Sequence, residues 1–118
     1  MDKNLESIIE LSDKMLSFRT QRLYIKEKFE ADTVFGYSGG IFKIDQSFIS
    51  YVKVMIDLGK KSNTVILDIN SNPIMIENLD NFLVEIIDRY VSALNRYHAE
   101  YQELKSTKPG SWKISRKV

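Results

Sequence analysis

The chain has 118 residues, 43% of them hydrophobic, which is enough for one compact domain with a modest core. Its 17 lysine and arginine residues nearly balance 16 aspartate and glutamate residues, which argues against a protein that coats nucleic acid or mimics it. Because there is no cysteine, a disulfide framework, a thiolate zinc site and a thiol nucleophile are all excluded.

The first seven residues, MDKNLES, have acidic and amide side chains where a signal peptide has basic and apolar ones. No apolar run approaches the length of a membrane span. We therefore expect a cytoplasmic protein with no membrane partner.

A first long helix is predicted from Asn4, an acceptable N-cap residue, to about Ala31. One seam of this helix repeats in steps of three and four and consists of Ile8, Leu11, Met15, Phe18, Arg22, Ile25 and Phe29. Arg22 is its one polar member. Its side chain either extends along the seam to reach water, or it fixes the register or the oligomeric state of the helix.

The middle of the chain alternates strand and helix signals. Thr33–Asp45 predicts a hairpin whose turn contains Ser38, Gly39 and Gly40, because glycine reaches the positive φ values that a tight turn needs. A helix from about Gln46 to Leu58 follows, with Asp45 as its N-cap and Gly59 as its stop. Lys60 to Asn63 is a polar link, and Thr64–Ile76 predicts a second hairpin with its turn at Asn70 to Asn72.

A second long helix, from Leu79 to Leu104, is capped by Asn78. Its seam repeats in steps of four and three and consists of Leu83, Ile87, Tyr90, Leu94, Tyr97, Tyr101 and Leu104. Two helices of similar length favour an antiparallel coiled coil. The expected fold is α+β, with long N- and C-terminal helices around a hairpin, helix and hairpin insert. It forms a single domain over residues 1–108, followed by a basic tail at 109–118.

Two short patterns have the residue types of ligand sites. Asp68, Asn70 and Asn72 occupy the first, third and fifth positions of a calcium loop. The sixth position is Pro73 instead of glycine and the twelfth is Leu79 instead of a carboxylate, so a turn is the preferred interpretation. The glycines of GYSGG lack the spacing of a phosphate-binding loop and are also assigned to a turn.

His98 is the only histidine, and a metal site needs more ligands than one histidine. Glu100 and Glu103 lie nearby on the same helix but are assigned to its solvated face, so His98 is interpreted as a partly buried helical residue and not as a ligand or a general base. We therefore expect no catalytic residue, no metal and no cofactor, and a protein that is not an enzyme.

Tyrosine and arginine are enriched at protein interfaces. The candidate interface residues are Tyr90, Leu94, Tyr97 and Tyr101 of the last helix, with Arg22 of the first. Ordinary packing between the two helices is the simpler interpretation of the tyrosines, and base stacking beside Arg89 and Arg96 is a third.

The tail is the sharpest signal. From Lys105 to the end there are five basic side chains and no acidic one. Its candidate contact residues are Trp112, Lys113, Arg116 and Lys117. Such a segment docks on an acidic protein surface, follows a phosphate backbone, or simply keeps the protein in solution.

Three segments resemble uncharacterised small proteins of myovirus-type tailed phages of marine cyanobacteria. They are FGYSGGIFKID, VILDINSNPIMIENLDNFL and RYVSALNRYHAEYQELK, and the resemblance covers about Thr33 to Lys105. It implies a phage accessory or virion protein, found in the host cytoplasm or the virion, and it carries no active-site residues.

The expected architecture is also similar to that of alpha-type prefoldin subunits, although the helices here are much shorter. Similarity of fold does not by itself transfer function. The expected function is a non-enzymatic protein-binding or assembly module that forms a homo-oligomer or binds a protein partner. The alternative is a small phage regulator whose basic tail binds nucleic acid or a host transcription component.

Overall fold

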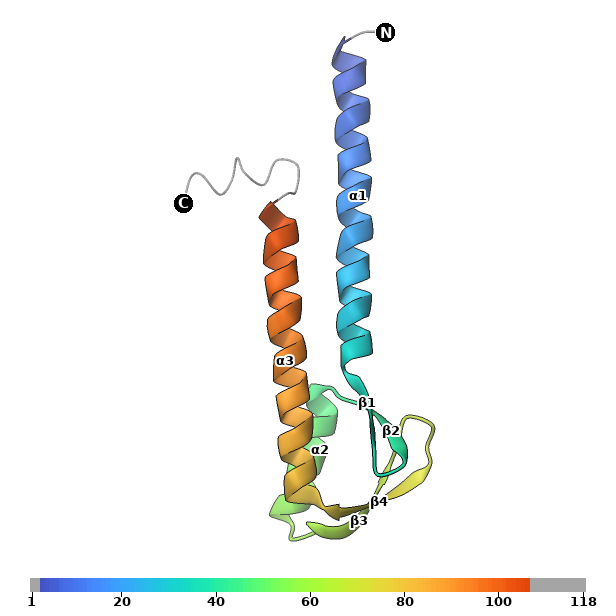
Figure 1. The fold of residues 1–118 in the computed structure, drawn as a ribbon, viewed down its shortest axis with the longest axis vertical. Coiled ribbons are helices and arrows are strands. Elements are labelled where there is room, and N and C mark those ends of the chain that lie inside the picture. The colour runs from blue at the N-terminus through green and yellow to red at the C-terminus, as the bar shows by residue number, and fades with distance from the viewer. Residues whose placement is uncertain (1–2, 107–118) are drawn as a thin grey trace. The chain divides into compact units, whose positions relative to one another are not determined.

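The computed structural model describes residues 3–106 (Figure 1). In chain order the elements are α1 (Lys3–Asp32), β1 (Val34–Tyr37), β2 (Gly40–Lys43), α2 (Gln46–Asp57), β3 (Ser62–Leu67), β4 (Pro73–Asn78) and α3 (Leu79–Ser106). The strands form two antiparallel two-stranded sheets, β1–β2 and β3–β4. The predicted α+β fold, with two long helices around a hairpin, helix and hairpin insert, is confirmed.

The chain forms two compact units, and both long helices contribute to each. The helical unit comprises residues 1–28 and 95–118, of which 3–28 and 95–106 are described. The core unit is Phe29–Leu94 and contains both hairpins and α2. The single domain over residues 1–108 stays a prediction, and the tail at 109–118 lies outside the described residues.

The first hairpin turns as its glycine signal predicted. Tyr37 pairs with Gly40, so the loop is the two residues Ser38 and Gly39, with φ values of 53° and 87°. Positive φ at both positions is the pattern of a type I′ turn. Gly40 lies in β2 for a different reason, because a Cβ there would come within 2.6 Å of Cγ1 of Ile74.

Lys43 of β2 marks the point where α1 ends. Its Nζ donates to the carbonyl oxygen of Glu30 at 3.2 Å and to the carboxylate of the same residue at 2.8 Å, and it also contacts the hydroxyl of Thr33. A cation at the C-terminal carbonyls of a helix is favoured by the helix dipole. Thr33 is fully buried, and its carbonyl accepts a hydrogen bond from the Ile44 amide at 2.7 Å.

The predicted caps hold α2 and α3 in place. Oδ1 of Asp45 accepts from the Phe48 amide at 2.7 Å, and Gly59, with φ of 83°, follows the end of α2. Oδ1 of Asn78 accepts from the Asn81 amide at 3.0 Å at the start of α3. Each bond satisfies a backbone donor that the first turn of a helix leaves free.

The main cluster of buried hydrophobic residues lies in the core unit. Its buried members come from β1, β2, α2, β3, β4 and α3 and from the link between β2 and α2, and they are Phe35, Phe42, Ile44, Val52, Ile66, Ile76, Leu79, Phe82 and Ile86. Phe82 of α3 is its centre, since its ring lies 4.8 Å from that of Tyr37, 5.2 Å from that of Phe42 and 6.0 Å from that of Phe48.

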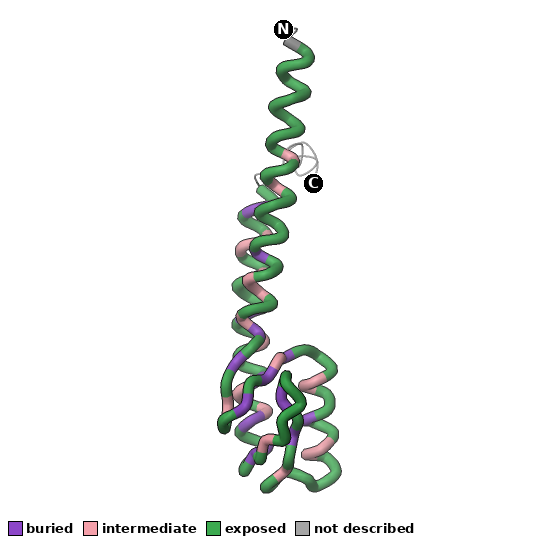
Figure 2. The backbone as a smooth tube through the Cα atoms, turned by 90° about the vertical axis from the view of Figure 1, so that its right-hand side faces the viewer, coloured by how far each residue is buried: buried purple, intermediate pink, exposed green. Residues whose placement is uncertain are grey.

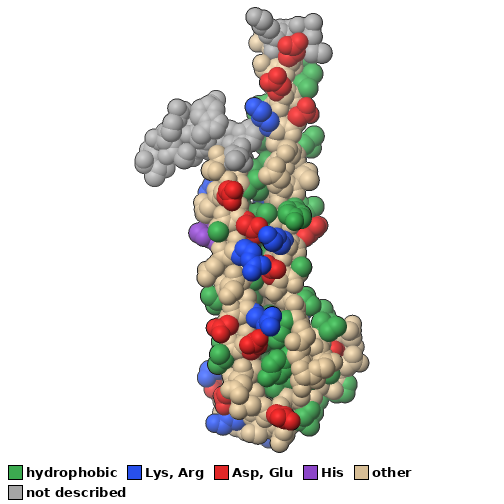
Figure 3. All heavy atoms as spheres, viewed as in Figure 1, with side chains coloured by type: hydrophobic (Ala, Val, Ile, Leu, Met, Phe, Trp, Pro, Cys, Tyr) green, Lys and Arg blue, Asp and Glu red, His purple; other side chains and the backbone are tan. Residues whose placement is uncertain are grey.

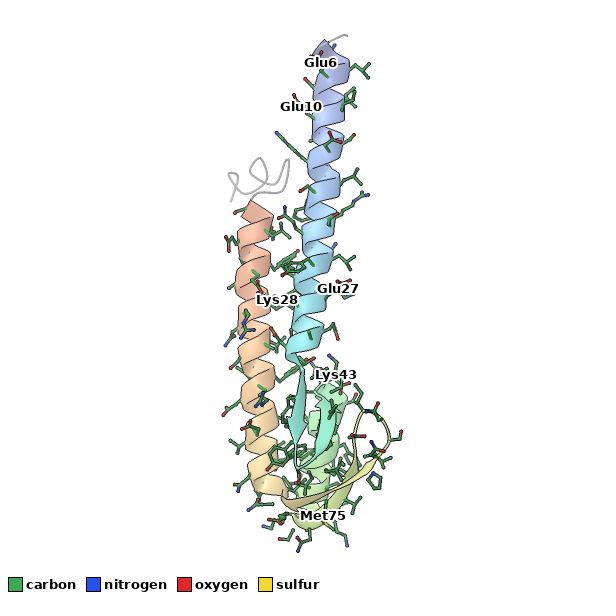
Figure 4. All side chains as sticks on the ribbon, turned by 45° about the vertical axis from the view of Figure 1, so that its right-hand side comes forward. Glu6, Glu10, Glu27, Lys28, Lys43 and Met75 are labelled. Atoms are coloured by element: carbon green, nitrogen blue, oxygen red, sulfur yellow. The ribbon has the colours of Figure 1, made fainter. Side chains whose placement is uncertain are left out.

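In both units α1 and α3 run antiparallel and contact one another (Figure 1). Within the core unit, the rings of Phe29 and Tyr90 are 6.2 Å apart. Within the helical unit, Nζ of Lys28 donates to Oε2 of Glu100 at 2.8 Å. Figure 4 shows Lys28 pointing toward α3 and Glu27, its neighbour, pointing away.

The predicted seam of α3 is correct in part. Leu104 is buried, and Tyr90, Tyr97 and Tyr101 are half-buried, but Ile87 and Leu94 are 38% and 39% exposed and are not seam residues. The buried positions before Tyr97 belong instead to Leu79, Phe82, Ile86 and Ala93. The first turns of α3 face the hairpins and α2, so the buried face is turned away from the predicted one.

The predicted seam of α1 needs a similar correction. Ile25 is buried, and Met15, Phe18 and Phe29 are half-buried. Ile8 and Leu11 are 60% and 53% exposed. Every side chain from Asn4 to Lys14 is exposed (Figure 2), because this stretch continues beyond the end of α3 at Ser106 (Figures 1 and 4).

Candidate interaction surfaces

The tyrosines predicted at an interface are half-buried within the chain. The ring of Tyr90 meets that of Phe29 and packs against the core. Tyr97 and Tyr101 are half-buried in the helical unit. Helix packing, the simpler of the alternatives, therefore accounts for much of their apolar surface.

The other predicted interface residues are on the surface or outside the structure. Leu94 is 39% exposed and Arg22 is exposed. The exposure of Arg22 fits the interpretation that its charge reaches water, and its role in an interface stays a prediction. The predicted tail contacts Trp112, Lys113, Arg116 and Lys117 lie outside the described residues.

A second apolar stripe runs along α3 in the core unit. Its members are spaced by three, four and three residues and are Val84, Ile87, Val91 and Leu94, exposed by 61%, 38%, 47% and 39%. We call them the α3 stripe. At 3.6 residues per turn the stripe lies roughly a quarter-turn or more around the helix from the buried face. This spacing is that of a helix that packs on a second helical neighbour.

The sequence analysis found half of this stripe and assigned it wrongly. Ile87 and Leu94 were placed on the seam facing α1, and Val84 and Val91 were overlooked. The signal was present, since α3 has apolar residues on more positions than one seam requires.

The β3–β4 hairpin has a second exposed apolar surface. Ile66 and Ile76 point into the core, while Val65 and Met75, which pair across the strands, are 50% and 48% exposed on the opposite face, and Leu67 is 60% exposed. We call Val65, Leu67 and Met75 the outer hairpin face; Figure 4 labels Met75. Strands that are apolar on both faces are typical of sheets covered on both sides. The uninterrupted run VIL at 65–67 was the sequence signal for it.

Arg89 is held by its own unit. Its Nε bonds Oε1 of Glu85 at 2.8 Å, and the centre of its guanidinium group lies 4.7 Å above the ring of Phe35. A guanidinium over an aromatic face gains both packing and cation–π attraction. Both interactions keep this side chain against the protein surface.

The loop that resembles a calcium site, Asp68–Asn72, is organised by backbone amides. Oδ1 of Asp68 accepts from the amides of Asn70 and Asn72 at 2.9 and 2.8 Å, and Oδ2 accepts from the Ile41 amide at 3.2 Å. Burial acts to raise the pKa of the Asp68 carboxyl, but the hydrogen bonds from Asn72, Ile41 and Asn70 outweigh it and lower the pKa. The carboxylate therefore fixes the turn and joins it to β2.

No protein-family model, curated protein or solved structure matches this chain. In residues 3–106, no cluster of three or more metal-binding side chains is present, and none of the helices in this range has both the length and the apolar character to cross a membrane.

His98 is exposed on α3, and its Nε2 lies 3.3 Å from Nε2 of Gln102 one turn further along. Between the two helices, the hydrogen bond to Glu100 and then its negative charge raise the pKa of Lys28. In the described part of the helical unit, Lys28 of α1 and Glu100 of α3 form an ion pair, and both side chains are partly exposed. Such a pair contributes little to stability.

Proposed function

We propose that this chain is a non-enzymatic protein-binding or assembly module that associates through the α3 stripe. The observation that carries the proposal is the exposed, regularly spaced set of Val84, Ile87, Val91 and Leu94 on a helix whose other face is already packed on the core. An isolated exposed leucine is ordinary, whereas a continuous exposed stripe marks an interaction surface.

The outer hairpin face supports the same proposal. Val65, Leu67 and Met75 are exposed on a sheet of two strands, and a hairpin of this size is marginal without further cover. Both of its strands are edge strands in the described part of the chain, so a partner can also add to the sheet through backbone hydrogen bonds. The basic tail, with Trp112, is proposed as a second contact.

The test is the mass of the purified protein by light scattering after size exclusion, over a wide range of concentration. We expect an oligomer whose fraction rises with concentration. In the Val91→Asp variant a charge is placed in the stripe, and burying it unpaired costs about 3 kcal/mol or more, which weakens association roughly a hundredfold.

Ser92→Asp is the matched control. It adds the same charge at the next residue, which is exposed on another side of α3, and we expect it to assemble like the original protein. Equal association by both variants would contradict the role of the stripe. A monomer at every concentration would exclude self-assembly and leave binding to a different protein as the form of the proposal.

A virion or accessory role in a tailed phage is the setting that the sequence resemblance implies, and the proposed surface does not depend on it. The second candidate function is regulation through binding of nucleic acid or a host transcription component. It is favoured by the basic composition of the tail and predicts an affinity that falls steeply with salt. Arg89, one of the two arginines considered for base stacking, already contacts Glu85 and Phe35.

A further inference from the structure

The N-terminal segment of α1, Asn4–Lys14, has apolar side chains that the described part of the chain leaves in solvent. Leu5 is 47% exposed, Ile8 60%, Ile9 44% and Leu11 53%. Two of them, Ile8 and Leu11, continue the line of Met15 and Phe18, which are half-buried in the helical unit. The side of α1 that faces α3 therefore stays apolar beyond the point where α3 ends.

The same segment is acidic. Glu6, Glu10 and Asp13 are all exposed, and Lys14 at its end is its only basic residue. Figure 4 labels Glu6 and Glu10 on this part of α1, and Figure 3 shows acidic and hydrophobic side chains next to one another there. Acidic residues in the first turns complement the helix dipole, which accounts for Glu6, but it accounts neither for Asp13 nor for the apolar residues.

The chain itself contains a segment with the complementary chemistry. Residues 107–118, which follow α3, have four basic side chains, Lys108, Lys113, Arg116 and Lys117, and no acidic one. They also include Trp112 and Ile114, two apolar side chains that suit an apolar surface. The segment 107–118 is thus basic where Asn4–Lys14 is mainly acidic, and both segments contain apolar side chains.

The distance to be covered is short. The last buried residue of α3 is Leu104, and the first half-buried residue of α1 is Met15, so α3 ends where the exposed segment of α1 begins. Asn4–Lys14 is about 15 Å long as a helix. Trp112 is six residues beyond Ser106, and six residues reach up to about 20 Å, so Trp112 can meet any part of the segment.

We propose that Asn4–Lys14 of α1 is the docking surface for residues 107–118 of the same chain. The apolar side chains Trp112 and Ile114 cover the line of Ile8 and Leu11, and the long basic side chains extend around the helix toward Glu10, the acidic residue nearest to Leu11. Glu6 and Asp13, further around the helix, add to the negative potential that attracts the basic tail. Docking completes the apolar side of α1 where α3 ends. It also makes the tail a contact within the chain, so that a nucleic acid or an acidic partner has to compete with α1 for it.

Trp112 is the only tryptophan, so its fluorescence reports on the tail of the full-length protein without a label. We expect emission at shorter wavelength and weaker quenching by acrylamide than for N-acetyltryptophanamide, at the same values over a wide range of protein concentration. The Ile8→Ser and Leu11→Ser double variant is expected to shift emission to longer wavelength and to raise quenching to that of the free compound. Exchanging Glu6, Glu10 and Asp13 for their amides is expected to weaken shielding and to remove its dependence on salt.

The matched control is Leu23→Ser with Glu27→Gln. It changes one exposed apolar and one exposed acidic residue of the same helix, outside the proposed surface, and is expected to leave Trp112 shielded. All measurements are repeated with the Val91→Asp variant, in which association through the α3 stripe is weakened. Shielding of Trp112 that persists in this variant comes from docking of the tail and not from that association.

Three results would overturn the proposal. Emission and quenching equal to those of free N-acetyltryptophanamide would show that the tail does not dock. Shielding that appears only as concentration rises would show that a second copy provides the surface. Shielding that appears only when an oligonucleotide is added would assign the tail to nucleic acid.

Discussion

Phe82→Ala is the sharpest test of the core. Phe82 is fully buried, and its ring meets Phe35 and Tyr37 of β1, Phe42 of β2 and Phe48 of α2 at centroid distances of 4.8 to 6.2 Å. Phe→Ala in a core costs about 3–5 kcal/mol, from lost burial and from the cavity that remains. Aromatic neighbours on three different elements cannot all close on one methyl group, so we expect the upper end, about 4–5 kcal/mol.

The assay is unfolding in urea followed by far-ultraviolet circular dichroism. With a slope of about 2 kcal/mol per molar urea, the loss lowers the midpoint by about 2 M with the slope unchanged. Because a small domain has only about 5–15 kcal/mol in total, a partly unfolded variant in water is also an acceptable result.

Tyr51→Ala is the comparison, because it removes a ring of similar size from α2 at a site that is 48% exposed. Its expected cost is about 1 kcal/mol or less. If the two variants unfolded at the same urea concentration, Phe82 would not be the centre of the core, and the packing described for α3 against both hairpins would be refuted.

Two further predictions concern the hairpins. Gly40→Ala places a Cβ 2.6 Å from Cγ1 of Ile74, which should cost about 1–3 kcal/mol. In urea unfolding the same substitution should cost less when it is made in the Ile74→Ala variant, because the side chain that it meets is then absent; an equal cost in both backgrounds would show that the close approach is not the cause. Asp68 has a lowered pKa in the folded chain, so it stabilises the fold above its ordinary pKa of about 4 and loses that effect as pH falls through the lower folded value. Asp68→Asn should therefore be less stable than the original protein at pH 7, with a gap that narrows toward pH 3, and a gap independent of pH would contradict the assignment.

Features decided by neighbouring residues were predictable from the sequence. The caps Asp45 and Asn78 and the turn at Ser38 and Gly39 depend on hydrogen bonds and backbone angles within a few residues, and the structure places all of them as expected. Element bounds were also close, although β3 begins at Ser62, inside the segment assigned to a polar link.

Features decided by distant residues were not predictable. Leu94 is large and apolar and was assigned to the seam, whereas the buried residue is the small Ala93, which adds little to a hydrophobic pattern. Gly40 was interpreted as a turn residue, but its constraint comes from Ile74, for which the local sequence has no signal.

The candidate surfaces were also predictable only where neighbouring residues decide them. Tyr90, Leu94, Tyr97 and Tyr101 were named from the sequence, but only the structure distinguishes the face of α3 that packs in the core from the α3 stripe. The outer hairpin face was missed because exposed and buried strand faces look alike when both are apolar.

The contact between Phe29 and Tyr90 has a consequence for the order of folding. Lys28 and Glu100 are 72 residues apart in the chain, and closing a flexible loop of that length costs about 4 kcal/mol in entropy. Once the core unit has formed, the rings of Phe29 and Tyr90 already hold the two helices together at their base. Each further pair then closes only a few residues, so we expect the long helices to pair after the core unit has formed and the N-terminal end of α1 to become ordered last.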